Sequence, residues 1–136
     1  MLIDGIIALL VADTAGVNAL VSGAVYANEL PRGYALPAIA VHRYGGSQEY
    51  EMAGPVGLRE DQIQFDCYGA TSDATQQVAE AVRSLLVAYV GTLSDGTVVR
   101  ACYLERDMDM PFMPKADTKG IANRSLLGFR VVSVRQ

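Results

Sequence analysis

The side chains that most often act as bases or nucleophiles are few in this chain: one histidine, His42, and two cysteines, Cys67 and Cys102. A histidine can activate a cysteine or a serine, but no recognised spacing connects His42 with either cysteine or with a particular serine. His42 falls midway along an expected strand, a position typical of a structural histidine. We therefore predict no catalytic site, and keep as an alternative a small α+β enzyme that uses His42 and nearby carboxylates.

Carboxylates alternate at Glu105, Asp107 and Asp109, a spacing that could gather three ligands around a metal ion. The residues between them do not match a calcium-binding EF-hand loop, and the chain has no cluster of histidines and cysteines for zinc. The Gly-Gly-Ser at residues 45–47 lacks the lysine and the helix that follow in a phosphate-binding loop. The sequence therefore predicts no metal, no cofactor and no enzymatic activity.

The two cysteines lie inside apolar, strand-like runs, and neither belongs to a C-x-x-C pair. Two cysteines are too few for a disulfide framework. A reduced thiol in such a run usually packs as a small core hydrophobe. We predict two buried free thiols, with a single Cys67–Cys102 disulfide as the alternative.

A chain of 136 residues is long enough for one domain with its own core, and 51% apolar and 19% charged residues are typical of a globular protein. The net charge of −4 argues against a generic DNA- or RNA-binding protein, although it leaves room for a local basic patch. The longest apolar run near the N-terminus, residues 5–12, is far shorter than the ~20 residues of a membrane span. No basic segment precedes this run, so we expect neither a secretory signal nor a membrane partner, and synthesis in the cytoplasm.

Two segments have the spacing of amphipathic helices. The first lies at the N-terminus, breaks near Asp13, and is followed by a short helical turn that ends at Gly23. The second and longer helix follows Gly69, with an N-cap predicted within residues 71–73 and a left-handed C-cap predicted at Gly91. Its buried stripe comprises Val78, Val82, Leu85, Leu86 and Tyr89.

Extended segments are predicted at a short piece that begins at Ala24 and at residues 36–44, 61–68, 98–105 and 125–135. Residues 61–68 alternate, with Ile63, Phe65 and Cys67 on one face and mainly polar side chains on the other. The element order is therefore α, β, β, β, α, β, β. Hairpin-like connections in this order predict an α+β fold, a mostly antiparallel sheet with the N-terminal helix and the long helix packed on one face.

Two further segments, residues 45–60 and 106–119, contain turn formers, charges and prolines without a clear period, and are predicted to be long loops. The first is expected to be a hairpin loop with short frayed strands near residues 50–52 and 56–58. Loops of about fifteen residues in a compact domain are commonly functional. The second is rich in methionine, which suits adaptable protein contacts, unless the loop folds back on its own core.

Taken in order, these segments resemble the tail-completion, or tail-terminator, family of long-tailed bacteriophages and related prophage or gene-transfer particles. The resemblance covers essentially the whole chain and no single motif in it is specific. It rests on the aliphatic N-terminal helix, on Pro31 and Pro37 bracketing the loop before a strand, and on Tyr68 ahead of the long helix. The quoted segments are AVYANELPRGYALPAIAVHRYGG, IQFDCYGATSDATQQVAEAVRSLL, the late Asp/Pro-rich loop and RSLLGFRVVSV.

The resemblance implies a structural virion protein that forms a homo-hexameric ring at the head-proximal end of the tail tube. Such a ring ends tube polymerisation and offers a docking surface to the head, so its partners would be the tail-tube protein and a head–tail connector or stopper protein. DNA would pass through the lumen without specific binding, which suits an acidic chain because negative walls repel phosphates. A head-side connector or adaptor of the same particle is the alternative.

Both long loops are then candidate interfaces, and their assignments could be exchanged. The first would extend to a neighbouring subunit or along the channel, and the second would contact a neighbour or the tube protein. The candidate residues are Tyr50, Met52, Val56, Leu58 and Arg59 in the first, and Arg106, Asp107, Met108, Asp109, Met110, Phe112, Met113 and Lys115 in the second.

Overall fold

The structure of the chain is a computed structural model, which describes residues 2–28, 37–51, 54–69, 71–87, 89–111 and 123–135. The helices in this part of the chain are α1 (Leu2–Ala12), α2 (Val17–Val21) and α3 (Ser72–Leu86). The strands are β1 (Val25–Ala27), β2 (Ala38–Glu51), β3 (Gly54–Gly69), β4 (Gly91–Thr92), β5 (Thr97–Pro111) and β6 (Asn123–Arg135).

The strands form one sheet in the order β1-β2-β3-β6-β5-β4. All neighbours pair antiparallel except β1 and β2, which run parallel with Val25 opposite Ile39. The last strand, β6, therefore lies in the middle of the sheet, between β3 and β5. The predicted α+β class and the mostly antiparallel sheet are confirmed.

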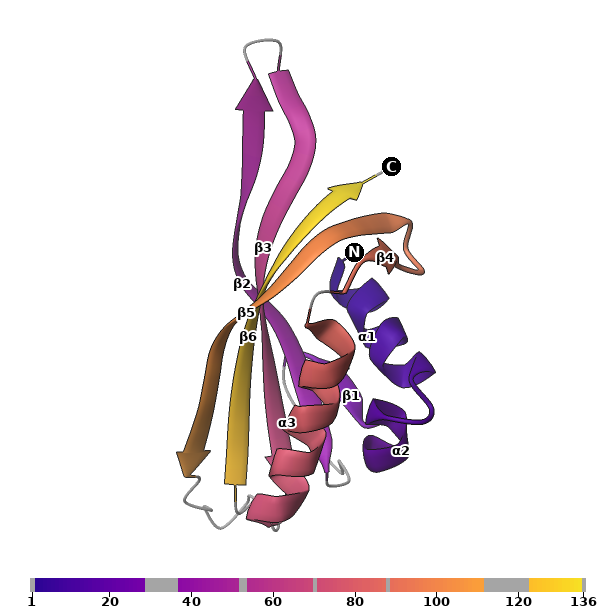
Figure 1. Cartoon of the computed structure of the whole chain (residues 1–136), viewed down its shortest axis with the longest axis vertical. Helices are drawn as coiled ribbons and strands as arrows, with labels where there is room; N and C mark the ends of the chain where they lie inside the picture. Colours follow the sequence, from indigo (N-terminus) through magenta and orange to yellow (C-terminus); the bar gives the residue numbers. More distant parts are fainter. Residues whose placement is uncertain are drawn as a thin grey trace.

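All three helices lie on one side of the sheet (Figure 1). Helix α3 contacts β3 and β6, α1 contacts β1 and β2, and α2 fills the space beside α1 and α3. The predicted placement of the helices on one face is therefore confirmed. None of these helices, within the residues that the structure describes, is long and apolar enough to cross a membrane.

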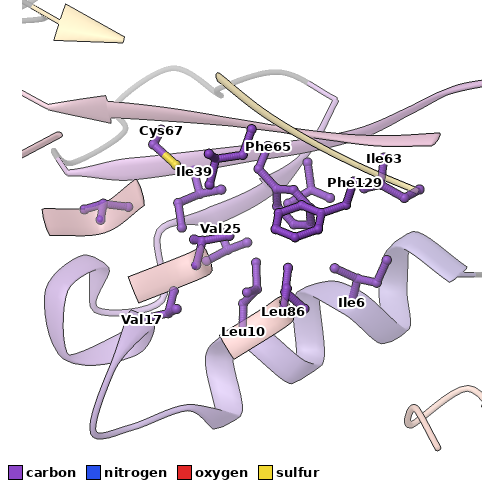
Figure 2. Close-up of a cluster of buried hydrophobic side chains, with 14 of the residues drawn as sticks. Ile6, Leu10, Val17, Val25, Ile39, Ile63, Phe65, Cys67, Leu86 and Phe129 are labelled. Atoms are coloured by element: carbon purple, nitrogen blue, oxygen red, sulfur yellow. The ribbon is translucent and has the colours of Figure 1, made fainter. Parts of the chain in front are cut away.

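The core lies between the helices and the sheet, where Ile6 and Leu10 of α1 point toward two phenylalanines of the sheet (Figure 2). Phe65 of β3 and Phe129 of β6 meet edge to face, with ring centroids 5.6 Å apart and an interplanar angle of 89°. Offset and edge-to-face aromatic pairs are the favoured geometries. The predicted alternation in β3 is confirmed, since Ile63, Phe65 and Cys67 are all fully buried.

Both cysteines are buried and free, as the apolar character of their strands predicted. Burial raises the pKa of the Cys67 thiol far above its usual range, with the nearby Asp66 charge adding to the effect. Burial also raises the pKa of Cys102 to about 12. Both thiols therefore remain protonated core side chains and not nucleophiles.

Helix α3 begins where predicted but ends earlier. The Thr71 hydroxyl oxygen accepts a hydrogen bond of 3.1 Å from the Ala74 backbone N–H, which makes Thr71 the N-cap. The predicted left-handed C-cap at Gly91 is wrong, because the helix ends at Leu86 and Val87 leaves it in an extended conformation. Gly91 instead begins β4, where its pairing with Val99 of β5 holds it in the sheet.

The two segments predicted to be long loops are largely strands. Residues 45–51 and 54–60 continue the β2–β3 ladder as far as Glu51 opposite Gly54, and residues 106–111 continue β5 opposite β6. Irregular pairing explains the missing period, since Tyr44 in β2 and Arg100 and Glu105 in β5 are extra residues of β-bulges. Nearer the end of the ladder, the single residue Glu49 of β2 lies opposite residues 56–58 of β3. Each bulge shifts the alternation of side chains by one residue.

Candidate assembly surfaces

The sheet face opposite the helices, here called the open face, carries three arginines stacked on tyrosines. Alternation places these side chains opposite the core residues of the same strands. Cation–π contacts of this kind stabilise by about 0.5–2 kcal/mol, and arginine and tyrosine are enriched in protein interfaces. The pairs are Arg106 over Tyr44 at 5.3 Å, Arg124 over Tyr68 at 5.8 Å and Arg130 over Tyr103 at 4.9 Å, each measured to the ring centroid.

The pair of Arg106 and Tyr44 depends on a glycine beneath it. A Cβ atom at Gly128 would lie 3.2 Å from Arg106 Cβ and 3.4 Å from the Tyr44 hydroxyl oxygen. Any side chain at this position would therefore crowd the two residues. The absence of a side chain at Gly128 of β6 thus lets side chains of β2 and β5 meet across β3 and β6, and sequence reasoning missed this role.

A buried carboxylate, Asp66, also lies on the open face. Its Oδ1 atom accepts a hydrogen bond of 3.0 Å from Gln64 Nε2 and lies 3.1 Å from Arg124 Nη2, while His42 Nδ1 lies 3.9 Å from Oδ2. A paired, hydrogen-bonded environment is what a buried charge requires. His42 faces this cluster, whereas Cys67 faces the core on the other side of the sheet, so the two cannot act as a catalytic pair.

Two of the three alternating carboxylates of β5, Glu105 and Asp107, lie on opposite faces of the sheet. Glu105 is the extra residue of a bulge and lies 4.0 Å from Arg130 on the open face. The bulge turns Asp107 to the helix face, where Arg83 of α3 donates to it at 2.6 Å. Among the described residues, no group of three potential metal ligands is close enough to hold an ion. The bulge thus directs Glu105 and Asp107 to opposite faces of the sheet, although they are two residues apart in the sequence.

The first set of candidate interface residues belongs to the two-stranded extension formed by residues 45–51 and 54–60, here called the β2–β3 arm. The arm projects beyond the helices at one end of the molecule (Figure 1). Tyr50 pairs with Pro55 in its backbone ladder, and Leu58 pairs with Val134 of β6. Arg59 is exposed, with Nη2 3.6 Å from Asp61 Oδ1, and Val56 belongs to β3. Met52 lies outside the described residues.

The second set of candidates is divided between the two faces of the sheet. Arg106 lies on the open face and Asp107 on the helix face, and Met108 has half of its surface exposed. Asp109 and Met110 are strand residues opposite Ser125 and Arg124. Phe112, Met113 and Lys115 lie outside the described residues. The structure therefore does not bring the two sets together, since the arm and this end of β5 lie at opposite ends of the molecule (Figure 1).

Comparison with known proteins identifies the kind of protein that this architecture belongs to. Residues 4–111 match the family model described as Tail completion protein gp17. The chain belongs to this family. A tail completion protein is a structural component of a virion tail and not an enzyme, in agreement with the sequence prediction. The match runs from α1 to the end of β5, so the central strand β6 lies beyond it.

The fold of this tail completion protein is also similar to that of a solved chain from the virion of a native gene transfer agent (GTA) particle. The two have a TM-score of 0.68 and 22% sequence identity, and the similarity covers 94% of this chain and 91% of that chain. The fold is therefore shared over nearly the whole of both chains. No curated protein sequence matches this chain.

One surface of the tail completion protein was not anticipated from the sequence. A groove of about 500 Å³ lies between β5 and the segment that follows α3, and is lined by Val87, Val90 and residues 100–104. Val87 and Val90 are 49% and 65% exposed and line the same groove, so they form one small exposed apolar patch. The apolar run Leu-Val-Ala-Tyr-Val at residues 86–90 was the available sequence signal.

Proposed function

We propose that this tail completion protein forms a closed homo-hexameric ring at the head-proximal end of the tail tube. The ring ends polymerisation of the tube and presents the surface on which the head docks. The observation that supports the proposal is the family match over residues 4–111. The similarity in fold to a chain of a gene transfer agent virion agrees with a place in such a particle.

The distribution of exposed elements suits a ring. The β2–β3 arm lies on one border of the sheet and the groove beside β5 lies on the other, as the strand order requires. Contacts between two different surfaces of identical subunits are heterologous, and they close into a ring when the rotation between neighbours is right. A pair of distinct surfaces is therefore what a ring subunit needs.

The charge of the chain suits a conduit for DNA. The net charge is −4, and a lumen with this sign of charge repels phosphate groups and lets the duplex slide. The partners proposed for the two rims of the ring are the tail-tube protein and the head–tail connector or stopper protein. The candidate contacts with these partners are Met108, which is half exposed, and Phe112, Met113 and Lys115, which lie outside the described residues.

Particles produced without this protein provide the test. If it ends the tube, its absence gives tubes longer than normal and heads without tails, which electron microscopy measures as a broadened length distribution. Tails of normal length beside filled, unattached heads would instead indicate a head-side connector, and would contradict the proposal. Supplying the wild-type gene on a plasmid should restore normal tail length and head attachment.

Met108 offers a direct test of the contact residues. Met108→Asp should leave the fold intact, because half of the side chain already lies in water, and should lower the yield of joined particles. Val11→Asp, which introduces the same charge at an exposed valine of α1 outside the candidate contact residues, serves as the control. Normal particle yield with Met108→Asp would remove this residue from the contact surface.

A further inference from the structure

Both borders of the sheet contain long stretches of edge that no described strand covers, here called open edges. On one border, β1 pairs with β2 only at residues 39–41, so no described strand covers β2 from His42 to Glu51 on that side. On the other border, β4 pairs with β5 only at Val98 and Val99, so no described strand covers β5 beyond them. The backbone N–H and C=O groups of such an edge are a template for another strand.

The groove described above runs along the open edge of β5. Residues 101–104 form its strand side and Val87 and Val90 its far side. A groove between an edge strand and the end of a helix is a geometry in which an extended segment adds to a sheet. Backbone hydrogen bonds then supply affinity, and alternate side chains of the added strand enter the groove.

Two bulges define the usable part of this edge. The extra residues at Arg100 and Glu105 interrupt the β5 ladder on either side of residues 101–104. A bulge disrupts regular pairing, so an added strand can align only with the segment between the two bulges. The edge therefore specifies both a position and a register for its partner.

The β2–β3 arm has the composition that this groove requires. Residues 48–58, QEYEMAGPVGL, combine apolar side chains with Glu49 and Glu51 and contain no basic residue. The groove combines exposed valines with the exposed Arg100, and none of the described residues that line it is a carboxylate. Opposite charges would therefore meet when the arm enters the groove. The arm is already paired as a hairpin, which reduces the entropy lost on binding.

We propose that neighbouring copies of this chain join by strand addition. The open edge of β2 in the arm of one copy pairs with residues 101–104 of β5 in the next copy, and apolar arm side chains enter the groove beside Val87 and Val90. This inference rests on the ring proposed above. Because the donor and acceptor edges lie on opposite borders of one sheet, each copy can donate to one neighbour and accept from the other.

Hydrogen exchange on the ring assembled with the tail-tube protein tests the proposal directly. Within residues 42–51 and 101–104, the amides that point away from the strand already paired should exchange at least about tenfold more slowly in the ring than in the isolated chain, because both edges become paired. A ring in which both segments exchange as fast as in the isolated chain overturns strand addition and leaves the ring intact. If native mass spectrometry shows no ring with the tube protein, both proposals fail.

Variants test the groove and its charge. Val90→Asp should lower the yield of ring at least about tenfold, whereas Val11→Asp, which changes an exposed valine of α1, should leave it within about twofold. Arg100→Glu should also lower the yield, and combining it with Glu49→Arg and Glu51→Arg should restore it. Circular dichroism and thermal midpoints confirm that each variant is folded. Equal yields for Val90→Asp and Val11→Asp would contradict the proposed groove.

Discussion

Arg83 of α3 donates a hydrogen bond of 2.6 Å from Nη2 to Oδ2 of Asp107 on β5. The same guanidinium contacts Glu80 one turn earlier on the helix. Asp107 reaches Arg83 only because the bulge at Glu105 turns it toward the helices. A residue expected in a loop thus connects the long helix with an outer strand of the sheet.

The Arg83–Asp107 pair should make a small contribution to the free energy of unfolding, and this contribution should depend on salt concentration. The two side chains are 25% and 42% exposed, so solvent screens their attraction, and the coupling free energy should be about 0.2–1 kcal/mol. A double-mutant cycle with Arg83→Gln and Asp107→Asn, followed by urea unfolding, measures it. The coupling should shrink at high ionic strength, and a value independent of salt would contradict the electrostatic origin.

Gly69 should not tolerate a side chain. A Cβ atom there would lie 2.5 Å from Thr75 Oγ1 and 2.9 Å from the Thr75 backbone N, so β3 and the first turn of α3 would have to move apart. Gly69→Ala should therefore lower the free energy of unfolding by about 1–3 kcal/mol, measured by urea unfolding.

Gly45→Ala is the matched control for Gly69→Ala. The nearest atom to its new Cβ is Gln62 Oε1 at 3.2 Å, the end of an exposed side chain that can move aside. This variant should change the free energy of unfolding by less than about 0.5 kcal/mol. Equal losses for both glycines would show that close packing at Gly69 is not the cause.

Asp95 should make the protein sensitive to acid. Partial burial tends to raise the pKa of Asp95, but hydrogen bonds from the Thr97 backbone N–H at 3.0 Å and hydroxyl at 2.9 Å outweigh it and hold the pKa below the usual 3.8. The stability that the carboxylate supplies is present above the unfolded pKa and is lost as the pH falls through the folded one. Asp95→Asn should therefore lower the thermal midpoint at about pH 7, with a smaller difference at about pH 3. A constant difference would contradict this assignment.

Cys102 should make the stability of the protein depend on pH in the alkaline range. Its pKa is raised by burial from 9.0 to about 12, so the folded protein keeps a proton that the unfolded chain releases. The resulting stability is present below pH 9.0 and is lost as the pH rises toward the folded value. The free energy of unfolding of the wild type should fall more steeply above pH 9.0 than that of Cys102→Ala, which has no thiol to ionise. Parallel slopes would indicate that the thiol is accessible in the folded state.

The sequence predicted the elements that rest on the core. In α3 the spacing of Val78 and Val82 predicts which face is buried, and in β3 the alternation of Ile63 and Phe65 does the same. Both patterns are visible in the sequence because one side of each element faces the same apolar layer. The free, buried state of both cysteines followed from the same reasoning.

The strand extensions, the strand order and the groove depend on contacts between distant segments, which a local sequence pattern does not predict. Three bulges and one stretch of uneven β2–β3 pairing interrupt the ladders, so residues 45–60 and 106–111 looked like loops. The strand order could not be predicted, since Leu127 and Phe129 would be buried in any central strand. The groove needs Val87 and Val90 to lie beside β5, a proximity that only the folded chain creates.

The central position of β6 has a consequence for biosynthesis. During translation β3 and β5 emerge before β6, yet each takes β6 as a neighbour, so each waits with an unpaired inner edge. Sheets built from distant segments fold slowly, and unpaired edges of nascent chains promote aggregation. Newly made chains therefore expose two unpaired strand edges until residues 123–135 have been synthesised, and aggregation competes with folding during this interval.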